Sequence, residues 1–140
     1  MAGGFLRWQR GPLAWMARQN KIPPQSSCEA EVGGLVPVLK EGVFAKQNID
    51  FIGSVERARG SPIHSITDSK SAYDVIRNPG ATKRTVHFDR WLHFARELYL
   101  RNAMKIFLTT TDKMMADVFT KAVDKTTFLR CRKYVMNLLA

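Results

Sequence analysis

Long apolar runs, cysteines and acidic residues are all scarce in this sequence. No apolar stretch approaches the roughly 20 residues that a membrane-spanning helix needs, and no secretory signal is recognisable. We therefore expect an intracellular protein of the cytoplasm or nucleus that is not secreted and has no membrane partner. Cys28 and Cys131 lie far apart and match no metal-binding spacing, so we interpret them as free thiols.

Basic residues outnumber the scarce acidic ones. The 140 residues contain 22 Lys and Arg against 12 Asp and Glu, which gives a formal net charge of +10. Such a balance suits a polyanionic partner such as nucleic acid, although many basic proteins bind none. The length is natural for one domain with its own core, so we interpret residues 1–140 as a single domain.

The residue patterns predict a mixed α/β fold. Strand-like segments flank the turn signal R-G-P at residues 10–12, which indicates a hairpin. A serine cap at residues 26–27 precedes a helix, in which Pro37 predicts a kink or a break near residue 36. Further strands are predicted at residues 62–66 and 104–108. Helices are predicted after the Ser69 cap as far as the stop at 78–80, and then at 85–102, 113–119 and 126–139.

Three carboxylates stand out by their positions. Asp68 lies where a strand ends and a helix begins, a place where ligand-facing residues gather in α/β folds. Taken alone, Asp68 is more simply a helix-capping residue. Glu31, in the first turns of a helix, and Asp117, at a helix start after a strand, share the pattern. Converging carboxylates suit hard divalent cations, but spacing alone does not separate them from solvated surface acids.

Several blocks of this sequence occur in the order found in one family, the ribonuclease H domain of copia-type retrotransposon polyproteins. Residues 11–15, G-P-L-A-W, resemble the family's G-P-I-S-W strand, and residues 26–31, S-S-C-E-A-E, its S-S-T-E-A-E helix start. Residues 68–72, D-S-K-S-A, are similar to D-N-Q-S-A. The remaining matches are N-P at 78–79, R-T-V-H-F-D at 84–89, H-F-A-R-E at 93–97 and A-D-V-F-T-K at 116–121.

The resemblance implies a ribonuclease H-like mixed sheet flanked by helices, with residues 3–125 as its core and 126–140 as a C-terminal helix. It implies that Glu31, Asp68 and Asp117 are catalytic acids that hold Mg²⁺ or Mn²⁺. The reaction would be two-metal hydrolysis of the RNA strand of an RNA–DNA hybrid. Four basic residues near the matching blocks are candidates for contacting phosphates: Lys70, Lys83, Arg84 and Lys121.

One feature of the family has no counterpart in this sequence. The family carries a further aspartate on a first, central strand before the hairpin, whereas the first aspartate here is Asp50. We therefore expect a ribonuclease H domain truncated on its N-terminal side, with two strand edges unpaired, whose partner is the upstream reverse transcriptase segment of a polyprotein. A non-catalytic nucleic-acid-binding module and a retroelement remnant without a function of its own are the alternatives.

Overall fold

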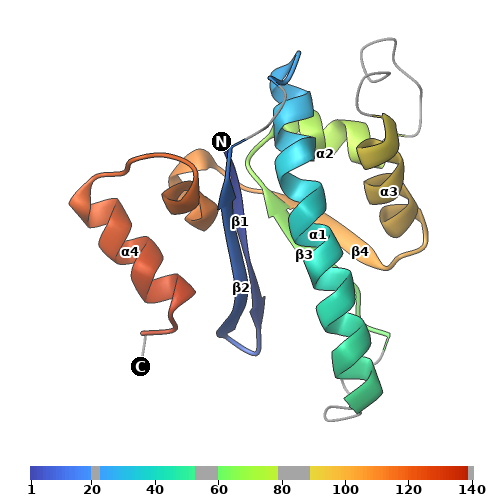
Figure 1. Cartoon of the computed structure of the whole chain (residues 1–140), viewed down its shortest axis with the longest axis horizontal. Helices are drawn as coiled ribbons and strands as arrows, with labels where there is room; N and C mark the ends of the chain where they lie inside the picture. The colour runs from blue at the N-terminus through green and yellow to red at the C-terminus, as the bar shows by residue number, and fades with distance from the viewer. Residues whose placement is uncertain (20–22, 53–59, 79–88, 139–140) are drawn as a thin grey trace.

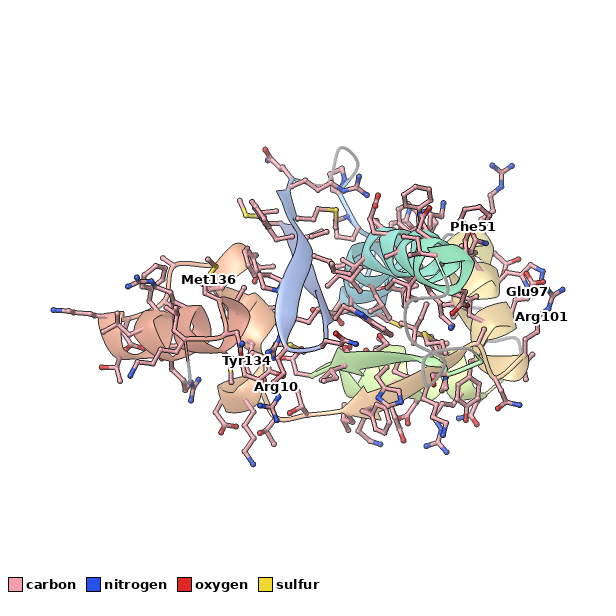
Figure 2. All side chains as sticks on the ribbon, turned by 90° about the horizontal axis from the view of Figure 1, so that it is seen from below. Arg10, Phe51, Glu97, Arg101, Tyr134 and Met136 are labelled. Carbon is pink, nitrogen blue, oxygen red and sulfur yellow. The ribbon has the colours of Figure 1, made fainter. Side chains whose placement is uncertain are left out.

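The computed structural model describes residues 1–19, 23–52, 60–78 and 89–138 (Figure 1). Within them the chain has the predicted mixed α/β fold, in the order β1, β2, α1, β3, α2, α3, β4, η3, η4 and α4. The described strands make two separate sheets, β1 with β2 and β3 with β4. α1 covers one face of the β3–β4 pair in both views, and the β1–β2 hairpin lies between α1 and α4 (Figures 1 and 2).

The N-terminal hairpin consists of β1 (Ala2–Trp8) and β2 (Gly11–Arg18), paired antiparallel. Gln9 and Arg10 form its turn, with positive φ angles of 47° and 73°, the backbone conformation that suits a two-residue hairpin turn. The turn therefore precedes the position predicted from R-G-P. Pro12 lies in β2 opposite Arg7, where the register shifts, because such an irregular position tolerates a residue without an N–H.

The long helix α1 spans Ser27–Ile52. The predicted serine cap is confirmed, since the Oγ of Ser26 accepts a 3.1 Å hydrogen bond from the backbone N–H of Glu29. Pro37 lies inside a continuous helix, so the break predicted near residue 36 is wrong. A proline costs about 3 kcal/mol in a helix interior, but Val36 and Leu39 beside it are buried in the core, and this packing holds the helix together.

β3 (Ile63–Thr67) and β4 (Met104–Leu108) pair in parallel. α2 (Lys70–Arg77) begins at the predicted cap, where the Oγ of Ser69 accepts a hydrogen bond from the N–H of Ala72 at 3.3 Å. Both strands and the cap therefore confirm the sequence-based prediction. α3 (Asp89–Leu100) is the described part of the helix predicted at 85–102, of which residues 85–88 lie outside the described residues.

Two short 3₁₀ helices, η3 (Thr111–Lys113) and η4 (Met115–Phe119), replace the α-helix predicted at 113–119. Met114 between them has an extended backbone, and neither element contains a buried residue, so no packed face favours a regular helix. α4 (Lys125–Val135) begins after the cap Asp124, which accepts a hydrogen bond from the N–H of Thr127. It is shorter than the predicted helix at 126–139.

The main core lies among α1, α2, α3 and β4. Its buried members are Val32, Val36, Leu39, Ala72, Ile76, Leu92, Ala95, Met104 and Ile106. The hairpin is held differently, because Phe5 of β1 packs against the rings of Phe119 and Tyr134, with ring centroids 6.0 and 6.3 Å apart. None of the described helices is both long enough and apolar enough to cross a membrane.

Candidate functional site

All three predicted acids line one groove between the hairpin and the β3–β4 pair. The groove has a volume of about 620 Å³, with β1 along one side, β3 along the other, and α1 and the η3–η4 segment as further walls. Glu31 comes from the start of α1, Asp68 follows β3 directly, and Asp117 belongs to η4. Residues far apart in the sequence therefore meet at this groove.

Local structure fixes the position of Asp68. The preceding residue, Thr67, ends β3 and is buried, with 5% of its surface exposed. Its Oγ1 accepts a hydrogen bond from the N–H of Ser69 at 3.2 Å, while Ser69 in turn caps α2. Asp68 is thus held between a buried strand end and a capped helix start, so its backbone has little freedom to move.

Asp117 is paired with a lysine of the same groove. The Nζ of Lys121 lies 2.6 Å from the carboxylate of Asp117, whose side chain is only 17% exposed. The backbone oxygen of Asp117 accepts hydrogen bonds from the N–H groups of Thr120 and Lys121, both at 3.0 Å. The hydrogen bond to Asp117 is the main cause that raises the pKa of Lys121, and the charges of Asp117, Asp68 and Glu31 add to it. Lys121 therefore acts as the counter-ion of the three acids.

The pKa of Glu31 is raised above its ordinary value of 4.5. Although Glu31 is an exposed residue, partial burial of its carboxyl group is the largest cause. Repulsion from Asp68 and then from Asp117 raises the pKa further, and the positive charge of Lys121 opposes the increase. The three acids are therefore close enough to influence one another electrostatically.

These acids match a metal site in chemistry but not in spacing. Carboxylate oxygens are the ligands that Mg²⁺ prefers in proteins. Among the described residues, however, no group of three or more His, Cys, Asp or Glu side chains is arranged so that it could hold a metal ion. As arranged here, the three acids form an electrostatically coupled group along the groove rather than a compact ligand cluster.

The predicted phosphate-binding residues lie in different places relative to the groove. Lys121 lines the groove. Lys70 does not line it, and its exposed side chain forms an ion pair with Asp74 at 3.1 Å. Lys83 and Arg84 lie outside the described residues. Of the predicted basic residues that the structure describes, only Lys121 thus lies beside the acids.

Sequence reasoning missed Arg7 and Tyr134, which also line the groove. The guanidinium carbon of Arg7 lies 4.1 Å from the centre of the Tyr134 ring, a distance typical of cation–π contact. Figure 2 shows Tyr134 beside the hairpin turn at Arg10. No local pattern signals this pair, because the two residues belong to elements at opposite ends of the sequence.

The raised pKa of Glu31 predicts a stability effect. A carboxyl group with a raised folded-state pKa holds its proton more tightly in the folded than in the unfolded chain. Its ionisation therefore destabilises the fold as pH rises above about 4.5. In buffer without divalent cations, Glu31→Gln should raise the melting temperature relative to the wild type at about pH 7, and this gain should shrink toward about pH 4.

Circular dichroism melts across this pH range measure the difference. The matched control is Glu41→Gln, a change at an exposed position of the same helix, which should show no such pH-dependent gain. A Glu31→Gln variant that is less stable than the wild type at neutral pH, and recovers on acidification, would contradict the assignment.

The fold and the groove place this chain in one structural class, a mixed α/β domain with a group of acids in a groove. These acids lie where a strand ends, a helix starts and a 3₁₀ helix follows, and their charges influence one another. Among known proteins, the chain is similar to the retrovirus-related Pol polyprotein from transposon TNT 1-94 of Nicotiana tabacum. The two are 26% identical over 133 residues, which cover 95% of this chain and 10% of the polyprotein. The chain therefore spans about a tenth of the length of this relative, and the similarity relates it to retrotransposon polyproteins.

No family model matches the chain. No solved structure matches it either.

Proposed function

We propose that this chain is a fragment of the ribonuclease H-type part of a retrotransposon polyprotein, which hydrolyses the RNA strand of RNA–DNA hybrids, and that the fragment alone is impaired in this activity. The observation that carries the proposal is that Glu31, Asp68 and Asp117 line one groove and are electrostatically coupled. The net charge of +10 suits a polyanionic substrate, and the similarity to a Pol polyprotein supports the retroelement context.

The surroundings of the three acids differ in ways that bear on the proposed hydrolysis. Asp68 is held by the strand end and the α2 cap, Glu31 has a raised pKa, and Asp117 is neutralised by Lys121. These three are the residues that would hold divalent cations, which when bound would supply water activation and stabilisation of the leaving oxygen. Because the three acids do not form a compact cluster among the described residues, the proposal requires a further negative ligand in addition to them.

A second candidate is nucleic-acid binding without cleavage. The excess of basic residues and the missing ligand cluster among the described residues both favour it. Four phosphate contacts would make the affinity for a hybrid fall about a hundredfold between about 50 mM and about 200 mM salt. This candidate predicts the same salt dependence as the first, but no hydrolysis under any condition.

Hydrolysis of an end-labelled RNA annealed to DNA, in Mg²⁺, tests the proposed function. The 140-residue chain should cleave the hybrid negligibly. A chain extended at its N-terminus by the segment that directly precedes the matched stretch in the tobacco polyprotein should cleave it, because that segment would add the further ligand. Duplex DNA is the control substrate and should remain intact. An extended chain that is folded and binds the hybrid but yields no product would refute the proposal and favour the second candidate.

A further inference from the structure

The hairpin and α4 pack together, apart from the main core. The ring of Phe5 on β1 meets the ring of Tyr134 on α4 edge to face, and the guanidinium group of Arg7 lies over the same tyrosine ring. In Figure 1, α4 lies on one side of the hairpin, whereas α2 and α3 lie on the other. We call residues 2–18 and 125–135 the hairpin–α4 lobe.

All charged residues of the hairpin–α4 lobe are basic. Neither the hairpin with its turn nor α4 contains an Asp or a Glu. The lobe therefore carries seven positive charges, a large part of the net charge of +10. The basic residues are Arg7, Arg10, Arg18, Lys125, Arg130, Arg132 and Lys133.

No carboxylate of the described residues lies at ion-pair distance from these seven side chains. Arg7 and Arg130 donate hydrogen bonds to backbone oxygens instead, those of Arg10 and Asp112. The positive charge of the lobe is therefore available to an outside polyanion. Elsewhere in the described chain, basic side chains do pair with acids: Lys46 with Asp50, Lys70 with Asp74, Arg101 with Glu97 and Lys121 with Asp117.

Trp15 of β2 presents an aromatic ring on the same lobe. It is 71% exposed, although tryptophan is highly buried on average. Trp15 pairs directly with Phe5 in the hairpin, and the side chains of directly opposite residues lie on the same face. Because Phe5 faces α4, Trp15 lies on the α4 side of the hairpin, on the outer strand. It does not line the groove that contains the acids.

An exposed aromatic ring among unpaired positive charges suits single-stranded nucleic acid. Bases stack on aromatic side chains while basic groups hold the phosphates. In a duplex the bases stack on one another, so their faces are not free for such a ring. An apolar peptide would use the ring but would gain nothing from the charges. Charge complementarity therefore favours a single-stranded nucleic acid as the occupant.

We propose that the hairpin–α4 lobe binds single-stranded nucleic acid, with a base stacked on Trp15 and phosphates held by the basic residues of the hairpin and α4. This surface differs from the groove, because Arg7 alone among the seven basic residues lines the groove. The proposal goes beyond the proposed function and does not depend on hydrolysis.

The probe is a fluorescein-labelled oligothymidine of about 12 nucleotides, a length that one small domain can cover. Its binding to the 140-residue chain is followed by fluorescence anisotropy in EDTA, so a failure of the proposed hydrolysis leaves the result unchanged. We expect saturable binding. With about four phosphate contacts, the affinity should fall about fiftyfold between about 50 mM and about 200 mM salt. Binding that does not respond to salt would contradict the proposal.

A pair of aromatic variants tests the stacking. Trp15→Ala should weaken binding about tenfold, and Trp15→Phe, which keeps a ring, should recover most of the affinity. The matched control is Phe51→Ala, because Phe51 is 90% exposed and lies at the opposite end of the molecule from Tyr134 (Figure 2). The oligonucleotide should also quench the tryptophan fluorescence of the wild type, and this quenching should be lost in Trp15→Phe. A duplex of the same length should bind Trp15→Ala and the wild type equally.

A pair of double variants tests the charges. Arg132→Gln with Lys133→Gln should weaken binding and lower the salt slope by about 0.7 for each lost phosphate contact. Arg90→Gln with Lys105→Gln removes the same charge at exposed positions of α3 and β4 and should change little. Circular dichroism shows whether each variant is folded, and the quenching result decides the question if Trp15→Ala is not. Equal losses in the two double variants, or full affinity in a folded Trp15→Ala, would overturn the proposal.

Discussion

Asp68→Asn in the extended chain should reduce hydrolysis of the hybrid about a thousandfold, which corresponds to about 4 kcal/mol of lost transition-state stabilisation. Asparagine keeps the size of the side chain and leaves the strand end and the Ser69 cap in place, but it removes one negative charge. Glu31, Asp117 and the ligand that the extension adds would remain, but Lys121 already neutralises Asp117. Too little negative charge would then remain to hold the two divalent cations that the proposed hydrolysis uses.

Asp74→Asn is the matched control. Asp74 lies on α2 six positions beyond Asp68, does not line the groove, and pairs with Lys70 on the surface. Losing such an exposed pair should change stability by less than about 1 kcal/mol and leave cleavage nearly unchanged. Rates at saturating hybrid are compared, with affinities measured in EDTA to separate binding from chemistry. Equal losses in both variants, or cleavage that survives Asp68→Asn, would show that Asp68 is not part of the site.

The sequence was sufficient for elements whose limits depend on local signals. β4 at Met104–Leu108 matches the prediction because a short apolar run is bounded by turn residues. The start of α2 follows from the ability of Ser69 to accept a hydrogen bond from the backbone N–H of Ala72. The break predicted near residue 36 was wrong because the continuity of α1 depends on tertiary packing of Val36 and Leu39, which no local pattern contains.

The candidate site could be predicted only from the resemblance of several sequence blocks to those of the ribonuclease H family. Each acid alone looks like a cap or a surface charge, and helical or strand periodicity says nothing about which ends of distant elements meet. The i, i+4 spacing of Asp117 and Lys121 suggests an ion pair, because residues four apart are neighbours on the surface of an α-helix. The ion pair is present, but Asp117 lies in a short 3₁₀ helix and not in the predicted α-helix. Arg7 and Tyr134 could not be found, because their contact depends on how α4 packs on the hairpin.

Leu92→Ala should have the largest effect on stability, a loss of about 2–5 kcal/mol. Leu92 lies on α3, is fully buried, and belongs to the core among α1, α2, α3 and β4. Alanine is the best helix former, so the helix itself would not weaken, and the loss would come from the removed apolar contacts and the cavity left behind. For a domain with a total stability of about 5–15 kcal/mol, this is a large fraction.

Leu100→Ala is the same chemical change on the same helix, at a residue that is 62% exposed. It should cost no more than about 0.5 kcal/mol. Urea denaturation followed by far-UV circular dichroism measures both variants, and a lower midpoint with an unchanged slope identifies a true loss of stability. Similar midpoints for the two variants would mean that α3 does not pack on α1 and β4 in solution. The wall of the groove that α1 forms would then lack its support, because Val32, Val36 and Leu39 of α1 belong to the same core.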